Sequence, residues 1–220
     1  MKPLPAVTHL LILVCLLSSS VSALEAVPAR ATVGTQSRQS LLNSSRIRAR
    51  FGNYGIDVLE QDSQVRVSRL YSREQGEKIT RTLAVVIYAG DIAPEILAEH
   101  QSIVAGGSIG EVFENSGWGV EKVTRYLGEI PASLDCAEIY ALMGGIQPVG
   151  LATQVYELCV CKAGQCMAYA TIAEVHHPDY FDQAQLQEIW NPENVPANPN
   201  RAEVEGLMNA VKQQLTRIAH

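Results

Sequence analysis

Two pairs of β-type segments, each joined by a polar turn with a glycine, restrict the fold of this chain most strongly. Val65–Tyr71 and Ile79–Tyr88 form the first pair, and Thr153–Cys161 and Cys166–Val175 form the second. Apolar segments separated by short glycine-containing turns are typical of β-hairpins, in which neighbouring strands run antiparallel. The sequence therefore predicts an antiparallel sheet that contains both hairpins.

Other segments predict helices and further strands around these hairpins. Pro94 stands at a first helical turn, where its missing N–H has no cost, and apolar residues follow it on one face. Together these elements predict an α+β domain over residues 46–182, with helices packed on the sheet. Helices are expected after Pro94 and at Ser108–Phe113, Pro131–Met143 and Gln183–Trp190, and strands at Ile47–Phe51, Gly55–Leu59 and Trp118–Leu127.

The first 23 residues have the pattern of a secretory signal peptide. Lys2 provides the positive start, Leu10–Leu17 is the apolar stretch, and Val21-Ser22-Ala23 is a small-residue cleavage site. We expect cleavage near Ala23, a periplasmic or secreted mature protein, and a flexible leader over residues 24–45. Because the apolar stretch is short and no later segment approaches about 18 uncharged residues, no membrane span is expected.

Acidic residues outnumber basic ones, with 23 Asp and Glu against 17 Lys and Arg and a formal net charge of −6. Binding to nucleic acid or to an anionic membrane depends on a concentrated basic surface. The basic residues of this chain are scattered, so both classes of partner are excluded at this point.

Residues 183–220 are expected to contain a linker and a C-terminal amphipathic helix. Asn191–Asn200 holds three prolines and four asparagines, which is typical of a linker. Asn200 and Glu203 have the spacing of a capping box, and apolar residues form one stripe along Arg201–His220. Such a helix packs on its own domain or docks on a partner or on a second copy of the chain, and the pattern leaves these alternatives open.

Four cysteines remain after the predicted cleavage, and an even number in an oxidising compartment favours two disulfides. If the second hairpin has a two-residue turn, Cys161 and Cys166 face each other across it at a separation suited to bridging. A second bridge between Cys136 and Cys159 would then join the preceding helix to the sheet. This is the preferred pairing among three alternatives.

The chain contains residues that can bind zinc, but it has no complete sequence motif for a metal site or for a catalytic nucleophile. Cys159, Cys161, Cys166 and the pair His176-His177 are zinc-ligand types, but their spacing matches no standard zinc template. The chain contains no Gly-x-Ser-x-Gly nucleophile turn and no phosphate-binding loop. We therefore expect structural disulfides, with neither a metal nor a cofactor.

Charged residues lie on the apolar faces of three predicted strands. With a period of two, Arg69 shares the apolar face of Val65–Tyr71, Arg81 shares that of Ile79–Tyr88, and Glu174 shares that of the last strand. Charges on apolar faces are rare unless they are paired, because their desolvation is costly. The three residues predict either a structural ion pair or a pocket for a small carboxylate, which arginine binds with two parallel hydrogen bonds.

The order of three segments gives this pattern a family resemblance. They are the hairpin Val65–Val86 with Arg81-Thr82, the helix Ser108–Phe113 before a strand with Thr124-Arg125-Tyr126, and the last hairpin, where Glu174 precedes Pro178 by four residues. Over residues 65–178 this order resembles the chorismate lyase-like fold. That fold is shared by chorismate lyases and by the ligand-sensing domains of some bacterial transcription regulators.

The resemblance implies an enclosed ligand cavity on an antiparallel sheet and a reaction without a cofactor. Chorismate lyases remove pyruvate from chorismate to give 4-hydroxybenzoate, and in them an arginine holds the carboxylate while a glutamate contacts the hydroxyl side of the ring. Glu174 matches that glutamate, and Arg69 is the best match to the arginine. Arg66 is the alternative, because the turn differs in length. Arg81 matches the Arg-Thr position and supports either the site or the structure.

Three functions follow from these patterns. The first is an exported domain that binds a small organic or aromatic acid through Arg69, Arg81 and Glu174. The second is a cofactor-free lyase for a chorismate-like acid, although chorismate itself is made and used in the cytoplasm. The third is a non-catalytic envelope interaction module that self-associates or docks through its C-terminal helix.

Overall fold

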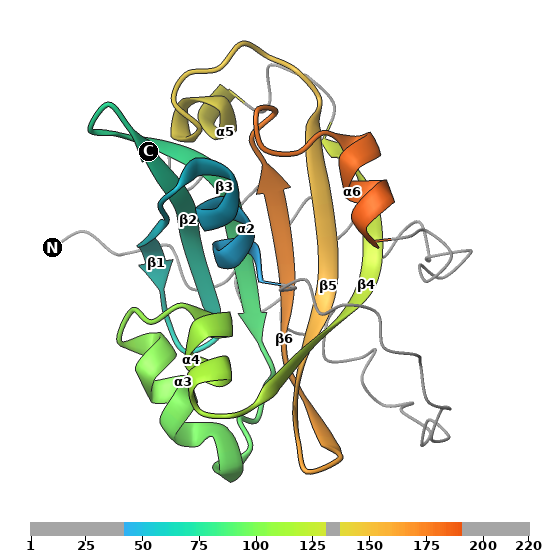
Figure 1. Cartoon of the computed structure of the whole chain (residues 1–220). Helices are drawn as coiled ribbons and strands as arrows, with labels where there is room; N and C mark the ends of the chain where they lie inside the picture. The colour runs from blue at the N-terminus through green and yellow to red at the C-terminus, as the bar shows by residue number, and fades with distance from the viewer. Residues whose placement is uncertain (1–41, 131–136, 191–220) are drawn as a thin grey trace, which may run out of the picture. The chain divides into compact units, whose positions relative to one another are not determined.

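Both predicted hairpins lie at the centre of one six-stranded antiparallel sheet in the computed structural model, which describes residues 42–130 and 137–190 (Figure 1). β3 of the first hairpin pairs with β6 of the second, so the strand order is β1-β2-β3-β6-β5-β4. The α+β class is therefore confirmed. The strands are β1 (Gly55–Gln61), β2 (Val65–Glu74), β3 (Glu77–Tyr88), β4 (Gly119–Ile130), β5 (Leu151–Lys162) and β6 (Gln165–His176).

The two hairpin turns have the same two-residue form. Gln75 and Gly76 connect β2 to β3 with φ angles of 52° and 92°, and Ala163 and Gly164 connect β5 to β6 with 52° and 81°. Positive φ at both central positions matches the twist of the flanking strands. Because these turns are so short, they fix the register of each hairpin next to the turn, and a β-bulge shifts it beyond Tyr71 in the first hairpin and beyond Cys159 in the second.

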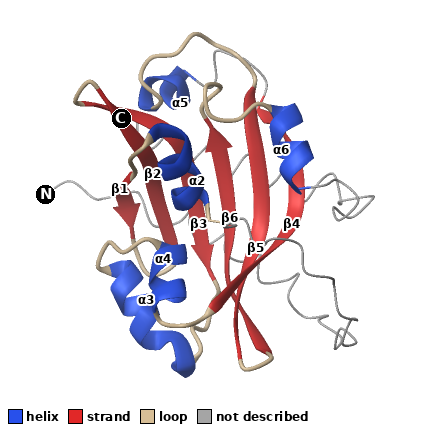
Figure 2. Cartoon of the chain, in the orientation of Figure 1, coloured by secondary structure: helices blue, strands red, loops and turns tan. Residues whose placement is uncertain are grey.

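Helices cover both faces of the sheet (Figure 2). Two clusters of buried apolar residues lie on the face covered by α2, α3, α4 and α6, which we call the helical face. A third cluster joins the opposite face to α5, and we call this the α5 face. The helices are α2 (Asn43–Phe51), the 3-10 turn η2 (Pro94–Ile96), α3 (Leu97–Val104), α4 (Ile109–Asn115), α5 (Ala137–Leu142) and α6 (Gln183–Trp190).

One predicted strand is a helix. The sequence predicts a strand at Ile47–Phe51, but these residues belong to α2. Residues of α2 spaced by four instead face the core, and Gly52 ends the helix in the left-handed conformation with φ 76°. The helix begins at Asn43, so its first three residues lie within the segment that was expected to be a leader, residues 24–45.

The remaining elements follow the sequence pattern where the structure describes them. The strand expected at Trp118–Leu127 and the helices after Pro94, at Ser108–Phe113 and at Gln183–Trp190 are all present within a few residues. The signal peptide, most of the leader, Cys136 and the helix expected at Arg201–His220 lie outside the described residues.

Candidate functional site

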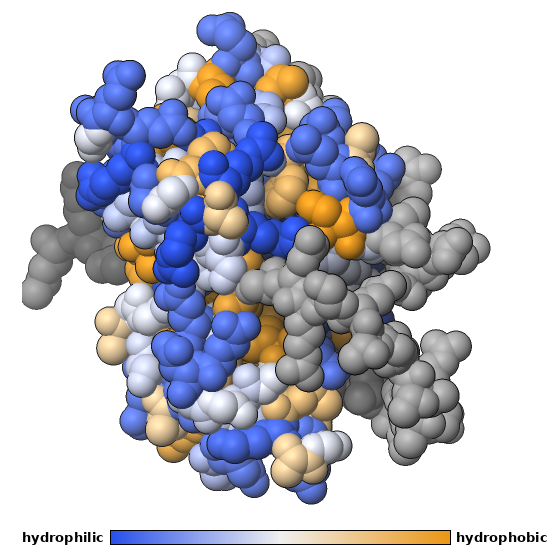
Figure 3. All heavy atoms as spheres, viewed as in Figure 1, coloured by the Kyte–Doolittle hydropathy of each residue, from blue (hydrophilic) through white to orange (hydrophobic). Residues whose placement is uncertain are grey.

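A cavity of about 70 Å³ lies on the helical face, between the sheet and the first turns of α2 and α4. The sheet contributes side chains from all six strands, because residues at alternate positions of each strand point to the same face. Apolar atoms are visible between the hydrophilic side chains of this face (Figure 3). The polar and charged side chains from the sheet that line the cavity are Arg66 and Ser68 of β2, Lys122 of β4, Tyr156 of β5 and Glu174 of β6.

Arg66 is a fully buried cation with unused hydrogen-bonding capacity. Its Nη1 donates to the carbonyl oxygens of Ile103 at 2.8 Å and Gly107 at 2.9 Å, which ties β2 to the segment between α3 and α4. Its Nε and Nη2 are buried without a hydrogen-bond partner. Among the ion pairs of the described residues, none involves Arg66. A buried guanidinium in this state is stabilised by an anion that reaches it.

The tyrosines whose ionisation Arg66 influences do not supply this negative charge. Burial raises the pKa of Tyr54 to about 12 and raises the pKa of Tyr88 and Tyr169 above the ordinary value, whereas Arg66 only partly opposes these shifts. All three phenols are therefore neutral near pH 7. These phenols therefore do not neutralise the charge of Arg66.

Glu174 lines the same cavity from β6. Its Oε1 accepts a hydrogen bond from Asn43 at 3.2 Å, whereas its Oε2 has no hydrogen-bond partner and lies 3.8 Å from Nζ of Lys122. Burial alone would raise the pKa of Glu174, but Lys122 above all, with His176, holds it below the ordinary value. The carboxyl is therefore ionised, and one of its oxygens is free to accept a hydrogen bond.

A chain of buried polar groups holds Glu174 in place. Asn43 of α2 also donates to Thr82 Oγ1 at 3.1 Å, and its Oδ1 accepts from the Tyr180 hydroxyl. Thr82 Oγ1 lies 3.0 Å from Nδ1 of His176. Burial lowers the pKa of His176 to about 4, so its ring is neutral near pH 7. Buried networks of this kind fix side-chain orientation, which keeps the Glu174 carboxylate directed into the cavity.

Arg69 lies on the opposite face of the sheet from Glu174. Arg69 is directly opposite Leu83 of β3, which packs in the α5-face cluster. Its Nε donates to Oδ2 of Asp57 at 2.9 Å, and Lys78 joins the same carboxylate at 2.7 Å. The expected common interior of Arg69 and Glu174 is therefore not formed. Both faces of this sheet are apolar and buried, so alternation shows which residues share a face but not which face holds the cavity.

Arg81 lies on the helical face but not among the described residues that line the cavity. Leu70 is opposite Thr82 and Tyr71 is opposite Thr80, so Arg81 is the extra residue of a β-bulge. The bulge changes the direction of its side chain, which was expected to share a face with Leu83. The guanidinium is centred 3.8 Å from the Phe51 ring, its Nε donates to Ser72 at 2.9 Å, and Glu74 pairs with it. These contacts give Arg81 a structural role.

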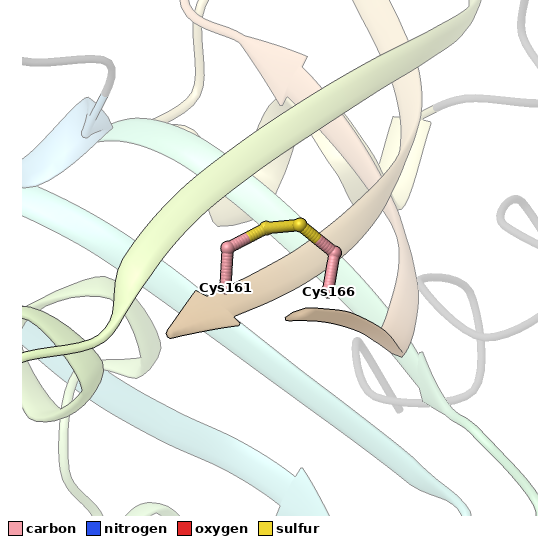
Figure 4. The surroundings of a disulfide bond; sticks show 2 residues. All are labelled: Cys161 and Cys166. Carbon is pink, nitrogen blue, oxygen red and sulfur yellow. A yellow bond between two sulfur atoms is a disulfide. The ribbon is translucent and has the colours of Figure 1, made fainter. Parts of the chain in front are cut away.

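The predicted disulfide between Cys161 and Cys166 is confirmed (Figure 4). The two residues are directly opposite each other near the turn of the β5–β6 hairpin, with their Cα atoms 4.1 Å apart. Cys159 forms no disulfide with any described residue. Because Cys136 lies outside the described residues, its pairing with Cys159 stays a prediction. A carboxylate oxygen of Glu121 lies within 4.8 Å of both bridged sulfurs, which are bonded to each other rather than free to ligate a metal.

Sequence reasoning missed Lys122, which the structure places in the cavity wall. Its side chain is only 4% exposed, and its Nζ lies 4.1 Å from the centre of the Tyr156 ring. Lys122 follows Glu121 and precedes Val123 in β4, so charged and apolar residues occur on both faces of this strand. The pattern therefore gave no reason to select Lys122.

Comparison of the chain with protein-family models finds no match, and a search of the curated proteins finds none. The resemblance to the chorismate lyase-like fold therefore stays a prediction. Every helix in the described part of the chain is too short or too polar to cross a membrane.

Proposed function

We propose that this chain is an exported binding protein for a small organic acid, with Arg66 as the residue that holds the carboxylate. One observation carries the proposal: Arg66 is fully buried in the cavity wall, and two of its guanidinium nitrogens have no partner. A carboxylate accepts two parallel hydrogen bonds from the neighbouring nitrogens of arginine. A bound acid would therefore satisfy both the charge and the free N–H groups of Arg66.

Glu174 lies at the other polar end of the cavity and favours an acid with a second functional group. Arg66 and Glu174 lie on β2 and β6, and β3 separates these strands. A ligand that reaches both residues has its polar groups at opposite ends. Glu174 Oε2 would accept a hydrogen bond from a hydroxyl or amine, and the side chains of Val86, Leu158 and Ile172 provide an apolar wall between. An aromatic or short aliphatic acid fits this arrangement.

Export is part of the proposal and is supported by two features. The first 23 residues have the signal-peptide pattern. The Cys161–Cys166 bridge is typical of proteins that fold in an oxidising compartment.

Calorimetric titration of the unreduced mature protein tests the proposal. The ligands are acetate, pyruvate, benzoate and 4-hydroxybenzoate, and native mass spectrometry reports any acid that co-purifies. We expect Arg66→Met to weaken binding of the best acid about 100-fold, since two charge-assisted hydrogen bonds are lost. Arg69→Met, from the same strand, is the matched control and should bind as the wild type does.

Two results would overturn the proposal. One is the absence of any bound or co-purified acid, and the other is an affinity that falls in Arg69→Met rather than in Arg66→Met. Release of pyruvate from an enolpyruvyl acid by the wild-type protein would identify a lyase instead of a binding protein.

A further inference from the structure

We infer that Lys122 is a reactive amine that forms a reversible imine with a small oxo acid bound in the cavity. The inference rests on the proposed function for one part of the ligand, because Arg66 provides the carboxylate site. It adds a covalent step to the binding of the acid. It also requires the ligand to carry a second functional group, an aldehyde or ketone carbonyl.

The first argument is the open geometry of the Lys122–Glu174 pair. Nζ of Lys122 and Oε2 of Glu174 are 3.8 Å apart, beyond hydrogen-bond distance, and Oε2 makes no hydrogen bond of ordinary length, although the Tyr156 hydroxyl is near enough to lower the pKa of Glu174. The two side chains are 4% and 5% exposed. By contrast, the more exposed pair of Lys78 and Asp57 is closed at 2.7 Å.

A structural ion pair inside the protein gains most from direct contact, because water does not satisfy its charges. The buried pair is nevertheless the open one, and both of its side chains line the cavity. The space between the amine and the carboxylate therefore suits a polar group of a ligand.

The second argument is that the surroundings of Lys122 lower its pKa, which raises the share of neutral amine, the form that attacks a carbonyl carbon. Lys122 is packed among α2, β5, β6 and α6. Burial lowers its pKa, Glu174 of β6 opposes this, and the second cation Arg46 of α2 lowers the pKa further. Desolvation and a neighbouring cation are two ways in which proteins activate a lysine.

The other groups that face the amine carry no charge near pH 7. Burial raises the pKa of Tyr156 of β5 well above its ordinary value and lowers that of His176 of β6 to about 4. The Trp190 ring of α6, centred 5.7 Å from Nζ, is uncharged as well. Glu174 is therefore the group that exchanges a proton with Lys122.

Imine formation balances with these residues alone. Nζ of the neutral amine bonds to the carbonyl carbon, and the carbonyl oxygen takes one hydrogen from the nitrogen to give a carbinolamine. The C–O bond then breaks, and the oxygen leaves as water with the second hydrogen of the amine. Glu174 relays these protons and stays as the counter-ion of the protonated imine. The reaction needs no oxidant or metal, and water reverses it.

Reductive trapping tests the inference with 4-formylbenzoate as the probe, because its aldehyde and its carboxylate lie at opposite ends of the ring, as Lys122 and Arg66 lie at opposite ends of the cavity. The full mature protein is incubated with 4-formylbenzoate and sodium cyanoborohydride, and intact mass spectrometry with peptide mapping locates the products. We expect one carboxybenzyl group on Lys122. Lys122→Arg keeps the positive charge beside Glu174 but cannot form the imine, so it should lose this product. Lys162→Arg, which removes an exposed lysine, should keep it.

Wild-type protein with no product at Lys122, or with products only on exposed lysines and the N-terminal amine, would overturn the inference. Calorimetry with benzoate separates that failure from failure of the proposed function, because loss of benzoate binding in Arg66→Met would still support the acid site. Benzaldehyde provides the converse control, since it has the aldehyde but no carboxylate. Equal labelling of Lys122 by benzaldehyde and 4-formylbenzoate, unchanged in Arg66→Met, would overturn the acid site and leave the reactive lysine.

Discussion

Two arginines of β2 lie on opposite faces of the sheet and differ in whether their charge is paired. Arg69 points to the α5 face, where Asp57 of the neighbouring strand pairs with it and its side chain stays 30% exposed. Arg66, three positions earlier, points to the helical face, where it is fully buried and two nitrogens have no partner. A charge that serves the fold is satisfied by its neighbours in the sheet. We propose that the charge of Arg66 is satisfied by a ligand that enters the cavity.

The packing of apolar side chains also differs between the α5 face and the helical face. Leu83, Val85 and Val175 of the α5 face belong to one apolar cluster with Ile139 and Met143 at α5. On the helical face the apolar residues divide into two clusters, and the cavity is lined by residues of both. The face that positions the candidate site is thus also the face where apolar packing is interrupted.

The largest expected effects on stability compare one leucine from each face. Leu83→Ala removes a side chain that is fully buried on the α5 face, and we expect a loss of about 3–5 kcal/mol. Leu158→Ala should cost only about 2 kcal/mol, because part of the Leu158 side chain already borders the cavity and has fewer atoms in contact. Urea unfolding with equal m-values measures both losses. Equal losses would show that the cavity is closed by side chains in solution.

The next prediction concerns pH and separates the two faces by their titrating groups. Burial lowers the pKa of His176 on the helical face from 6.5 to about 4. Between these values the unfolded chain binds a proton that the folded protein does not, so the folded state loses stability as the pH falls through this window. The loss should reach about 3 kcal/mol at the acid end.

The carboxyl of Asp57 on the α5 face titrates at a lower pH than the His176 ring does. Burial alone would raise its pKa, but hydrogen bonds from Lys78 and Arg69 hold it below 3.8, so its contribution to stability is lost only as the pH falls below that value. Unfolding midpoints between pH 7 and 4 should therefore fall steeply in the wild type and less in His176→Gln. His100 and His177, whose pKa values burial also lowers, contribute to the slope that remains, and Glu174, whose pKa is lowered from 4.5, contributes at its acid end. Equal slopes would show that His176 is not buried as a neutral ring.

Most of the fold could be predicted, because the local sequence preferences of the two central hairpins agree with the way these hairpins pack in the folded sheet. The polar turns with a glycine placed both central hairpins, and the two-residue turn expected at Ala163-Gly164 also predicted the Cys161–Cys166 bridge. Prediction failed at Ile47–Phe51, where the residues alternate as in a strand but lie in a helix. With only five residues, a strand period and a helix period are not distinguished, and packing on the sheet decides.

The site was less predictable for geometric reasons. Glu174 was identified from its apolar face, and Arg66 was identified only as the alternative to Arg69. Choosing between these arginines requires knowing which buried face holds the cavity, and this depends on where α2 and α4 lie. Lys122 needs the strand order as well, because β4 comes beside β5 only in the folded sheet. Sequence periodicity carries none of this long-range information.

The smallest expected effect comes from the disulfide, which lies on the α5 side of the β5–β6 hairpin, outside the cavity. The bridge closes a loop of few residues, so the chain-entropy estimate of its contribution is about 2 kcal/mol. The Ala163-Gly164 turn already holds the two strands together, which makes that value an upper bound. Cys161→Ser with Cys166→Ser should therefore lower the urea midpoint modestly and leave acid binding unchanged. If binding weakened as strongly as in Arg66→Met, the end of the hairpin would be coupled to the cavity, and the separation of the two faces would fail.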